Sequence, residues 1–91
     1  MFYLVSYDVV NDRRRTKIAK KLEDYGKRVQ YSVFECLLDD NRIEDLKRAI
    51  IPFLNEDEDS LRIYNLCQSC LKSVKVLGIG EISSDPEVYI I

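Results

Sequence analysis

The spacing of apolar residues changes several times along this chain, and those changes constrain its fold more than any other feature. Residues 2–9 (FYLVSYDV) are aromatic and β-branched, which is typical of a strand. After Asn11 or Asp12, either of which can cap a helix, apolar residues recur at helical spacing. Gly26 is expected to end that helix as its C′ residue. These residues therefore predict a strand and then a helix whose core-facing stripe is Ile18, Ala19, Leu22 and Tyr25.

The rest of the chain alternates in the same way between strand-like and helical spacing. The predicted elements are a long strand at 28–38, a helix capped by Asp40 or Asn41 and ended near residue 51 by Pro52, a solvated acidic turn at 55–60, strands at 60–66 and 73–78, and an apolar, β-prone tail, EVYII, after Asp85–Pro86.

This order of elements predicts an α+β fold, a ferredoxin-like βαββαβ sandwich in which two helices cover one face of an antiparallel sheet. A chain of 91 residues has room for one domain, with residues 1–80 as its core and 81–91 as an extra C-terminal strand. The uncovered sheet face would expose large apolar side chains, so we expect a homodimer that packs sheet against sheet. The tail strand would then pair with an edge of its own sheet or of the partner's.

Charge is strongly segregated along the sequence, although its total is only −2. Residues 11–28 hold eight basic and three acidic residues, a local balance of +5, and the other 73 residues carry −7. Such asymmetry predicts a basic surface that faces a polyanion and binds its phosphates without reading bases. The alternative is a solvated helix face paired with Glu23 and Asp24. The candidate phosphate-binding residues are Arg14, Arg15, Lys17, Lys21 and Arg28.

Composition excludes several classes of function. The chain has no histidine, so a histidine base, a Ser-His-Asp triad and a histidine-bearing zinc site are all ruled out. It has no apolar run of 18 residues and its first residues do not read as a signal peptide. We therefore expect a cytoplasmic protein without a membrane partner.

Three cysteines, an odd number, argue against a secreted disulfide framework. Cys67 and Cys70 have the spacing of a redox or metal-binding pair. One such pair cannot close a four-ligand zinc site within one chain. Structural thiols, a disulfide and a metal ligand all stay open for these two residues.

Asp8 is the candidate metal ligand because it stands where the first strand ends, beside the basic helix. A carboxylate there can hold a hard cation against a phosphate, and a two-fold axis near the strand would bring two copies together. The alternative is a turn or helix N-terminal partner. Ser32 and Phe34 share one face of the next strand. Ser32 can donate to a phosphate or fill the pleat, and Phe34 can pack in a core or interface or stack on a base.

The stretch YDVVNDRRRTKIAKKLEDYGKRVQYSVFEC resembles the start of the small CRISPR-associated adaptation protein, the second universal protein of those systems. The likeness continues through DEDSLRIYNLCQSC and SVKVLG and covers about residues 1–80. It implies a ferredoxin-like homodimer with a divalent metal, usually Mg²⁺, at Asp8. The positions that the resemblance places around the site are Tyr7, Asp8, Arg15, Lys17, Arg28, Ser32 and Phe34.

Two functions follow from this resemblance. One is a metal-dependent endonuclease that cuts single-stranded RNA, or DNA in some members, and takes part in spacer acquisition. The other is a non-catalytic DNA-binding scaffold that assembles with the CRISPR integrase. A small-ligand-binding regulator is the third reading, and the absence of glycine-rich ligand loops and the basic helix argue against it.

Overall fold

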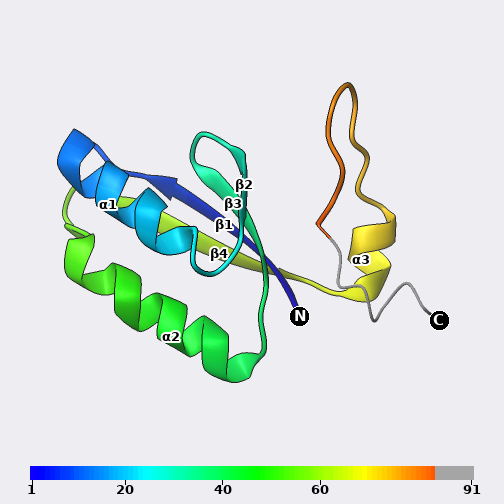
Figure 1. The fold of residues 1–91 in the computed structure, drawn as a ribbon, viewed down its shortest axis with the longest axis horizontal. Coiled ribbons are helices and arrows are strands. Elements are labelled where there is room, and N and C mark those ends of the chain that lie inside the picture. The colour runs from blue at the N-terminus through cyan, green and yellow to red at the C-terminus, as the bar shows by residue number, and fades with distance from the viewer. Residues whose placement is uncertain (84–91) are drawn as a thin grey trace.

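The computed structural model describes residues 1–83 and shows one four-stranded antiparallel sheet with strand order β2-β3-β1-β4. Helices α1 and α2 lie side by side on one face of that sheet (Figure 1). The elements are β1 (Phe2–Asp8), α1 (Asp12–Leu22), β2 (Lys27–Gln30), β3 (Val33–Leu37), α2 (Asp40–Ile50), the 3-10 turn η1 (Ile51–Phe53), β4 (Ser60–Leu66) and α3 (Gln68–Lys72). The expected ferredoxin-like βαββαβ arrangement is confirmed.

The prediction of one long strand at 28–38 was wrong, because this segment is a hairpin. Strands β2 and β3 pair antiparallel around a turn at Tyr31 and Ser32, with a bulge between Arg28 and Gln30. The turn contains no glycine, proline or asparagine, so nothing in the sequence interrupts the strand-like alternation. The hairpin supplies the two strands that the βαββαβ order requires between the two helices.

The strand predicted at 73–78 was also wrong. The fourth strand is β4, which pairs with β1 from Phe2↔Leu66 to Asp8↔Ser60. The chain then forms α3 and continues without a strand through residue 83. Val74 and Val76 have strand-like spacing, but they lie exposed and pair with no strand within residues 1–83. Most of the predicted tail strand, residues 84–91, lies outside the described residues, so that strand and the division at residue 80 stay predictions.

The core lies between the sheet and the two long helices. Val5 and Phe34 from the sheet, Ile18 and Leu22 from α1, and Leu46 from α2 are fully buried there. Burying each such side chain contributes about 1.5–3 kcal/mol relative to exposure. Besides Val5, β1 contributes Tyr3 and Tyr7 to this core, and Val9 joins it directly after the strand.

The helix starts are fixed by side-chain caps. Asn11 caps α1, because its Oδ1 accepts the Arg14 N–H at 3.0 Å. The predicted cap of α2 by Asp40 or Asn41 was wrong: Asp39 accepts the Arg42 N–H at 2.8 Å, so the helix begins earlier. The last turn of α2 gives way to η1 at Pro52, as expected.

Gly26 has a different role from the one predicted. Only Gly78 and Gly80 have positive φ among the described residues, so Gly26 is not a left-handed C′ residue. A Cβ at Gly26 would overlap the carbonyl oxygen of Glu35 and lie 2.5 Å from the Cys36 sulfur. The absent side chain therefore lets the α1–β2 connection pass close against β3.

The face of the sheet opposite α1 and α2 carries apolar side chains that the two helices do not cover. The register places Leu4 between Glu35 and Tyr64 on this face. Tyr64 and Leu37 keep 44% and 38% of their surface exposed. The described chain returns here, because the Ser83 N–H donates to the Glu35 carboxylate at 2.8 Å. Dimerisation through this face stays a prediction.

Candidate functional site

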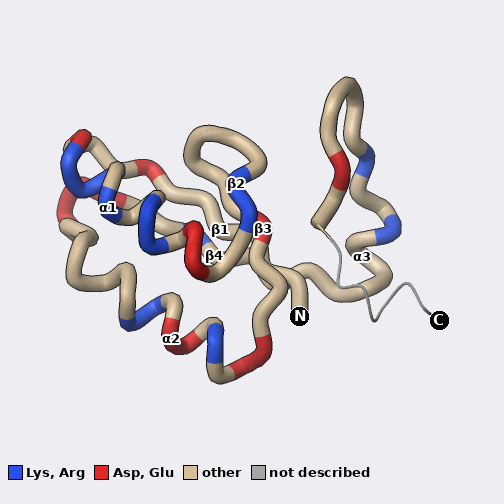
Figure 2. Tube along the Cα trace, in the orientation of Figure 1, with Lys and Arg blue, Asp and Glu red and all other residues tan. Residues whose placement is uncertain are grey.

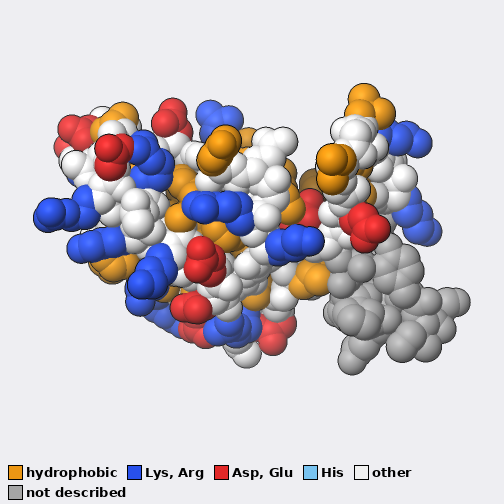
Figure 3. Space-filling model, turned by 45° about the horizontal axis from the view of Figure 1, so that its top comes forward, with side chains coloured by type: hydrophobic (Ala, Val, Ile, Leu, Met, Phe, Trp, Pro, Cys, Tyr) orange, Lys and Arg blue, Asp and Glu red, His pale blue; other side chains and the backbone are white. Residues whose placement is uncertain are grey.

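A cavity of about 480 Å³ opens between α1 and the β2–β3 hairpin. Three cationic side chains, Arg15, Lys20 and Arg28, face one carboxylate, Glu23, around it. Figure 3 shows Lys and Arg side chains gathered over α1 and the start of β2. The complete lining is Tyr7, Arg15, Thr16, Ala19, Lys20, Glu23, Arg28, Tyr31 and Ser32. The fold thus brings together four of the predicted site residues, Tyr7, Arg15, Arg28 and Ser32.

Tyr7 forms the floor of this cavity. Its ring is buried in the core, and its hydroxyl donates to the Tyr31 carbonyl at 3.1 Å. The same oxygen accepts a hydrogen bond from Arg28 Nη2 at 3.3 Å. The guanidinium of Arg28 also lies 5.3 Å from the centroid of the Phe34 ring. These contacts hold Arg28 at the cavity wall, and no carboxylate within residues 1–83 forms an ion pair with it.

Phe34 supports this arrangement from below. It is fully buried, and its ring centroid lies 6.4 Å from that of Tyr7. A fully buried ring has no free face for a base, so Phe34 acts here by packing under Arg28.

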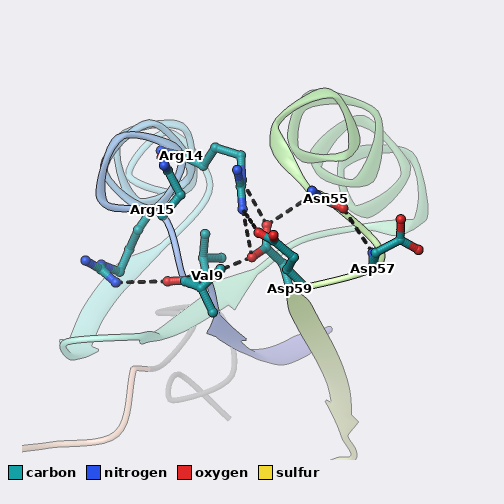
Figure 4. Close-up of polar contacts among 9 residues, drawn as sticks. Val9, Arg14, Arg15, Asn55, Asp57 and Asp59 are labelled. Atoms are coloured by element: carbon teal, nitrogen blue, oxygen red, sulfur yellow. Dashed lines mark hydrogen bonds and ion pairs between the residues drawn. The ribbon is translucent and has the colours of Figure 1, made fainter.

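Arg15 ties the start of α1 to the end of β1. Its Nη1 donates to the Val9 carbonyl at 2.9 Å (Figure 4), and its Nη2 pairs with Asp12. The side chain still exposes 41% of its surface. Arg15 therefore both fixes the β1–α1 connection and presents positive charge to the cavity.

Asp8 does not line the cavity. Side chains alternate along β1, so Asp8 leaves the strand on the face opposite Tyr7, exposed and level with Ser60 of β4. Arg62, which also points to this open face, is the neighbouring cation. Asp8 and the cavity therefore lie at the same end of β1 but on opposite faces of the sheet.

One chain offers little to a metal ion at Asp8. A carboxylate oxygen is the ligand type that Mg²⁺ prefers. Across residues 1–83, however, no group of three carboxylate or thiol residues comes together to hold a metal. The Asp8 carboxylate is a suitable ligand for Mg²⁺, but one chain supplies too few protein ligands for a metal site unless a second copy adds its own.

Arg14 is held by the acidic turn that precedes β4. Its Nε lies 3.1 Å from Oδ2 of Asp59 and its Nη2 lies 3.0 Å from Glu58 (Figure 4). The Asp59 side chain is fully buried and also accepts backbone N–H bonds from Val10 and Asn55. The expectation of a merely solvated turn was therefore wrong.

The contacts of Asp59 set its charge state. The hydrogen bond from Arg14 is the main cause that lowers the pKa of Asp59, and the two backbone N–H groups add to it against the effect of burial. The pKa of Arg14 is raised by the same contact. The predicted contact of Arg14 with nucleic acid stays a prediction, but its guanidinium already serves two carboxylates.

Lys17 and Lys21 lie on the other flank of α1. They line a second cavity, of about 450 Å³, with Lys20, Glu23, Asp24 and Phe53. The Lys17 ammonium lies 5.8 Å from the centroid of the Phe53 ring. Arg15 thus lines the first cavity, Lys17 and Lys21 line the second, and Lys20 lies between the two and lines both, along the one short helix that Figure 2 shows.

A family model described as "CRISPR associated protein Cas2" matches residues 1–74. This chain belongs to the Cas2 family. The CRISPR-associated endoribonuclease Cas2 3 of Chloroflexus aurantiacus is 42% identical over 91 residues, covering 100% of this chain and 98% of that protein. The CRISPR-associated endonuclease Cas2 2 of Thermus thermophilus is 44% identical over 89 residues, with coverage of 98% and 94%.

A solved Cas2-family structure shares the fold. It belongs to a partial Cas6-RT-Cas1–Cas2 complex and matches with a TM-score of 0.74 and 34% identity, over 84% of this chain and 89% of that one. No helix within residues 1–83 of this Cas2-family chain is long and apolar enough to cross a membrane.

Sequence reasoning missed three residues that line the main cavity of this Cas2-family chain: Thr16, Lys20 and Tyr31. Helical spacing could have found two of them, because Thr16, Lys20 and Glu23 follow one another at i, i+4 and i+7. Tyr31, which is 93% exposed, had no such signal, because the turn that carries it was not predicted.

Proposed function

We propose that this chain is a CRISPR-associated endonuclease of spacer acquisition, acting on single-stranded RNA or on DNA. The observation that carries the proposal is the cavity in which Arg15, Lys20 and Arg28 face one carboxylate, in a member of the Cas2 family. The names of the relatives in Chloroflexus and Thermus support nuclease activity.

Arg15, Lys20 and Arg28 would bind the phosphates of the backbone. Three cations on a concave surface attract a polyanion through its phosphates, which carry no sequence information. The hydroxyl of Ser32 lies in the same lining and can donate to a phosphate oxygen. Lys17 and Lys21 would extend the basic track across the other flank of α1. Binding should then depend on salt far more than on base sequence.

Asp8 would hold a divalent metal, with Mg²⁺ as the ion that suits a carboxylate. We infer that a homodimer completes the site, because one chain supplies one carboxylate and leaves an apolar sheet face uncovered. When bound, the metal supplies charge stabilisation at the phosphate and an activated water. Asp8 and the cavity share one end of β1 but lie on opposite faces of the sheet, so a backbone held by Arg15 and Arg28 would pass around that end of the strand to reach the metal.

A second function is a scaffold that binds DNA beside the CRISPR integrase without cutting it. Two observations favour it: no metal-binding cluster forms within residues 1–83, and a solved relative is part of a complex that contains Cas1. In that case the basic cavity would matter and the Asp8 carboxylate would not.

Asp8→Asn separates the two functions. The purified variant and wild type are assayed for RNA and DNA cleavage with Mg²⁺ or with a chelator, and for spacer integration with the integrase. We expect Asp8→Asn to lose cleavage and keep nucleic-acid affinity, because the amide preserves size and removes charge. Ser60→Ala, at the opposite strand position, is the matched control and should cleave like wild type. Equal cleavage by Asp8→Asn and wild type would reject the catalytic role of Asp8 and favour the scaffold.

A further inference from the structure

Two exposed thiols lie side by side at the junction of β4 and α3. The sulfur atoms of Cys67 and Cys70 are 3.4 Å apart, and both residues are exposed. Cys67 follows the last residue of β4 and caps α3, whereas Cys70 lies within that helix. A disulfide joins sulfurs at about 2.05 Å, so the two sulfurs must approach each other further to form the bond.

We propose that Cys67 and Cys70 form a thiol–disulfide exchange site that reacts with low-molecular-weight disulfides such as oxidised glutathione. The inference goes beyond the proposed nuclease function and uses none of its residues. It rests on the proximity and exposure of both sulfurs, which the third cysteine does not share.

The order of attack follows from the local contacts. The backbone N–H of Cys70 and then its thiol stabilise a thiolate at Cys67 and lower its pKa, and the same thiol contact raises the pKa of Cys70. Because the thiolate is the nucleophile, Cys67 is the attacking residue and Cys70 is the resolving one.

The exchange balances in two steps. The Cys67 thiolate attacks one sulfur of the glutathione disulfide, whose S–S bond breaks and releases one glutathione thiolate. Cys70 then gives its proton to water, and its sulfur attacks the Cys67 sulfur of the mixed disulfide, which releases the second glutathione. Two protein thiols are oxidised to one disulfide, and one glutathione disulfide is reduced to two thiols.

Cys36 is an internal reference for this reaction. It is fully buried in β3, where burial raises the pKa of its thiol to about 11. A buried thiol in its protonated form is inert toward disulfides. Any change in Cys36 labelling would therefore report unfolding rather than exchange.

The disulfide would fix the link between β4 and the segment that follows it. α3 connects the edge strand β4 to residues 74–83, whose last described residue bonds to Glu35 on the open face. Closing the ring between Cys67 and Cys70 restricts the first turn of this short helix. Oxidation should therefore slow amide exchange in α3 and leave exchange in α1 and α2 unchanged.

The test uses the full chain, first reduced and then incubated with oxidised glutathione. Samples are quenched with acid, alkylated before and after denaturation, and analysed by mass spectrometry. We expect wild type to lose two alkylatable thiols and two hydrogens, without bound glutathione, while Cys36 is labelled only after denaturation. Added dithiothreitol should restore both thiols.

Two variants make the assignment specific. Cys70→Ser should stop at the mixed disulfide on Cys67, because no resolving thiol remains, and Cys67→Ser should react several-fold more slowly at Cys70. Wild type that accumulates the mixed disulfide, that links two chains through these cysteines, or that keeps both thiols would overturn the proposal. Equal rates at Cys67 and Cys70 in the two variants would overturn the assigned order.

Discussion

The two flanks of α1 carry similar charges and use them differently. On the flank toward the acidic turn, Arg14 is paired with Glu58 and Asp59, and the Asp59 carboxylate is buried. On the flank toward the hairpin, Lys20 of α1 and Arg28 of β2 line a cavity in which Glu23 is the one carboxylate among the described residues. In the first arrangement the positive charge of Arg14 is neutralised by ion pairs that join α1 to the acidic turn. In the second arrangement the positive charges of Lys20 and Arg28 face an open cavity.

This difference shows that neighbours in the sequence can belong to separate systems. Arg14 and Arg15 are adjacent, yet Arg14 faces residues 44 and 45 positions away while Arg15 bonds within six positions, to Val9 and Asp12. The helix turns by about 100° per residue, which sends the two side chains in different directions. A count of basic residues therefore overestimates what the helix offers to a phosphate backbone.

The largest expected effect on stability comes from filling the space at Gly26, which lies in the connection between α1 and β2. Gly26→Ala would force a Cβ against the Glu35 carbonyl and the Cys36 sulfur. Overpacking of this kind costs about 1–3 kcal/mol, and the hairpin should shift away from α1. Urea unfolding of the variant and of wild type would measure the loss. An unchanged free energy of unfolding would show that β3 relaxes without cost.

Removing the ion pairs of Arg14 with Glu58 and Asp59 should lower stability and leave nucleic-acid binding almost unchanged. Arg14→Gln removes the ion pairs and leaves the buried Asp59 carboxylate with its two backbone donors. We expect a lower melting temperature, by less than that of Gly26→Ala, and the same salt dependence of binding as wild type. Arg13→Gln, at an exposed position of the same turn, is the control for loss of charge. A lower salt slope in Arg14→Gln than in Arg13→Gln would show that Arg14 also contacts phosphates.

The lowered pKa of Asp59 predicts how stability changes with pH. The pKa of Asp59 is lowered in the folded protein, mainly by Arg14, relative to about 3.9 in an unfolded chain. Its contribution is therefore fully present above about pH 4 and is lost as pH falls through the lower, folded value. Asp59→Asn should be less stable than wild type at pH 7, and the difference should shrink at acidic pH. Thermal melts of both proteins between pH 7 and pH 2 would measure this, and a constant difference would assign the acid sensitivity elsewhere.

The sequence predicted the parts of the fold that depend on local spacing. The stripe of Ile18 and Leu22, the alternation in β1 and the Asn11 cap are all properties of a few neighbouring residues. The same alternation places Tyr7 and Asp8 on opposite faces of the sheet. Local rules suffice there because backbone geometry alone decides which way each side chain points.

Features that depend on distant partners were not predictable. The pairing of Arg14 with Asp59 joins α1 to a turn that local composition describes only as acidic. The hairpin turn at Tyr31 lacks the residues that usually mark one, and residues 73–78 have strand-like spacing but no neighbouring edge. In each case the outcome is decided by tertiary contacts, which a single sequence does not display.

The smallest effect expected on stability, and the clearest effect on nucleic-acid binding, comes from replacing the two cavity residues Lys20 and Arg28. Lys20→Gln combined with Arg28→Gln removes two cations that form no ion pair within the described residues, so the fold should keep its melting temperature within a few degrees. Each lost phosphate contact lowers the slope of log affinity against log salt by about 0.7 on a single strand, or up to about 1.4 for both. Binding to single-stranded RNA at several salt concentrations would measure it.

Lys47→Gln is the matched control for this prediction, because Lys47 is an exposed lysine on α2, away from the cavity lining. It should leave the slope unchanged. If Lys47→Gln lowers the slope per charge as much as the cavity pair does, the protein binds through its general surface charge. If the cavity pair lowers the slope and Arg14→Gln does not, the two flanks of α1 are functionally distinct, since the same helix then supplies one charge to the fold and another to the ligand.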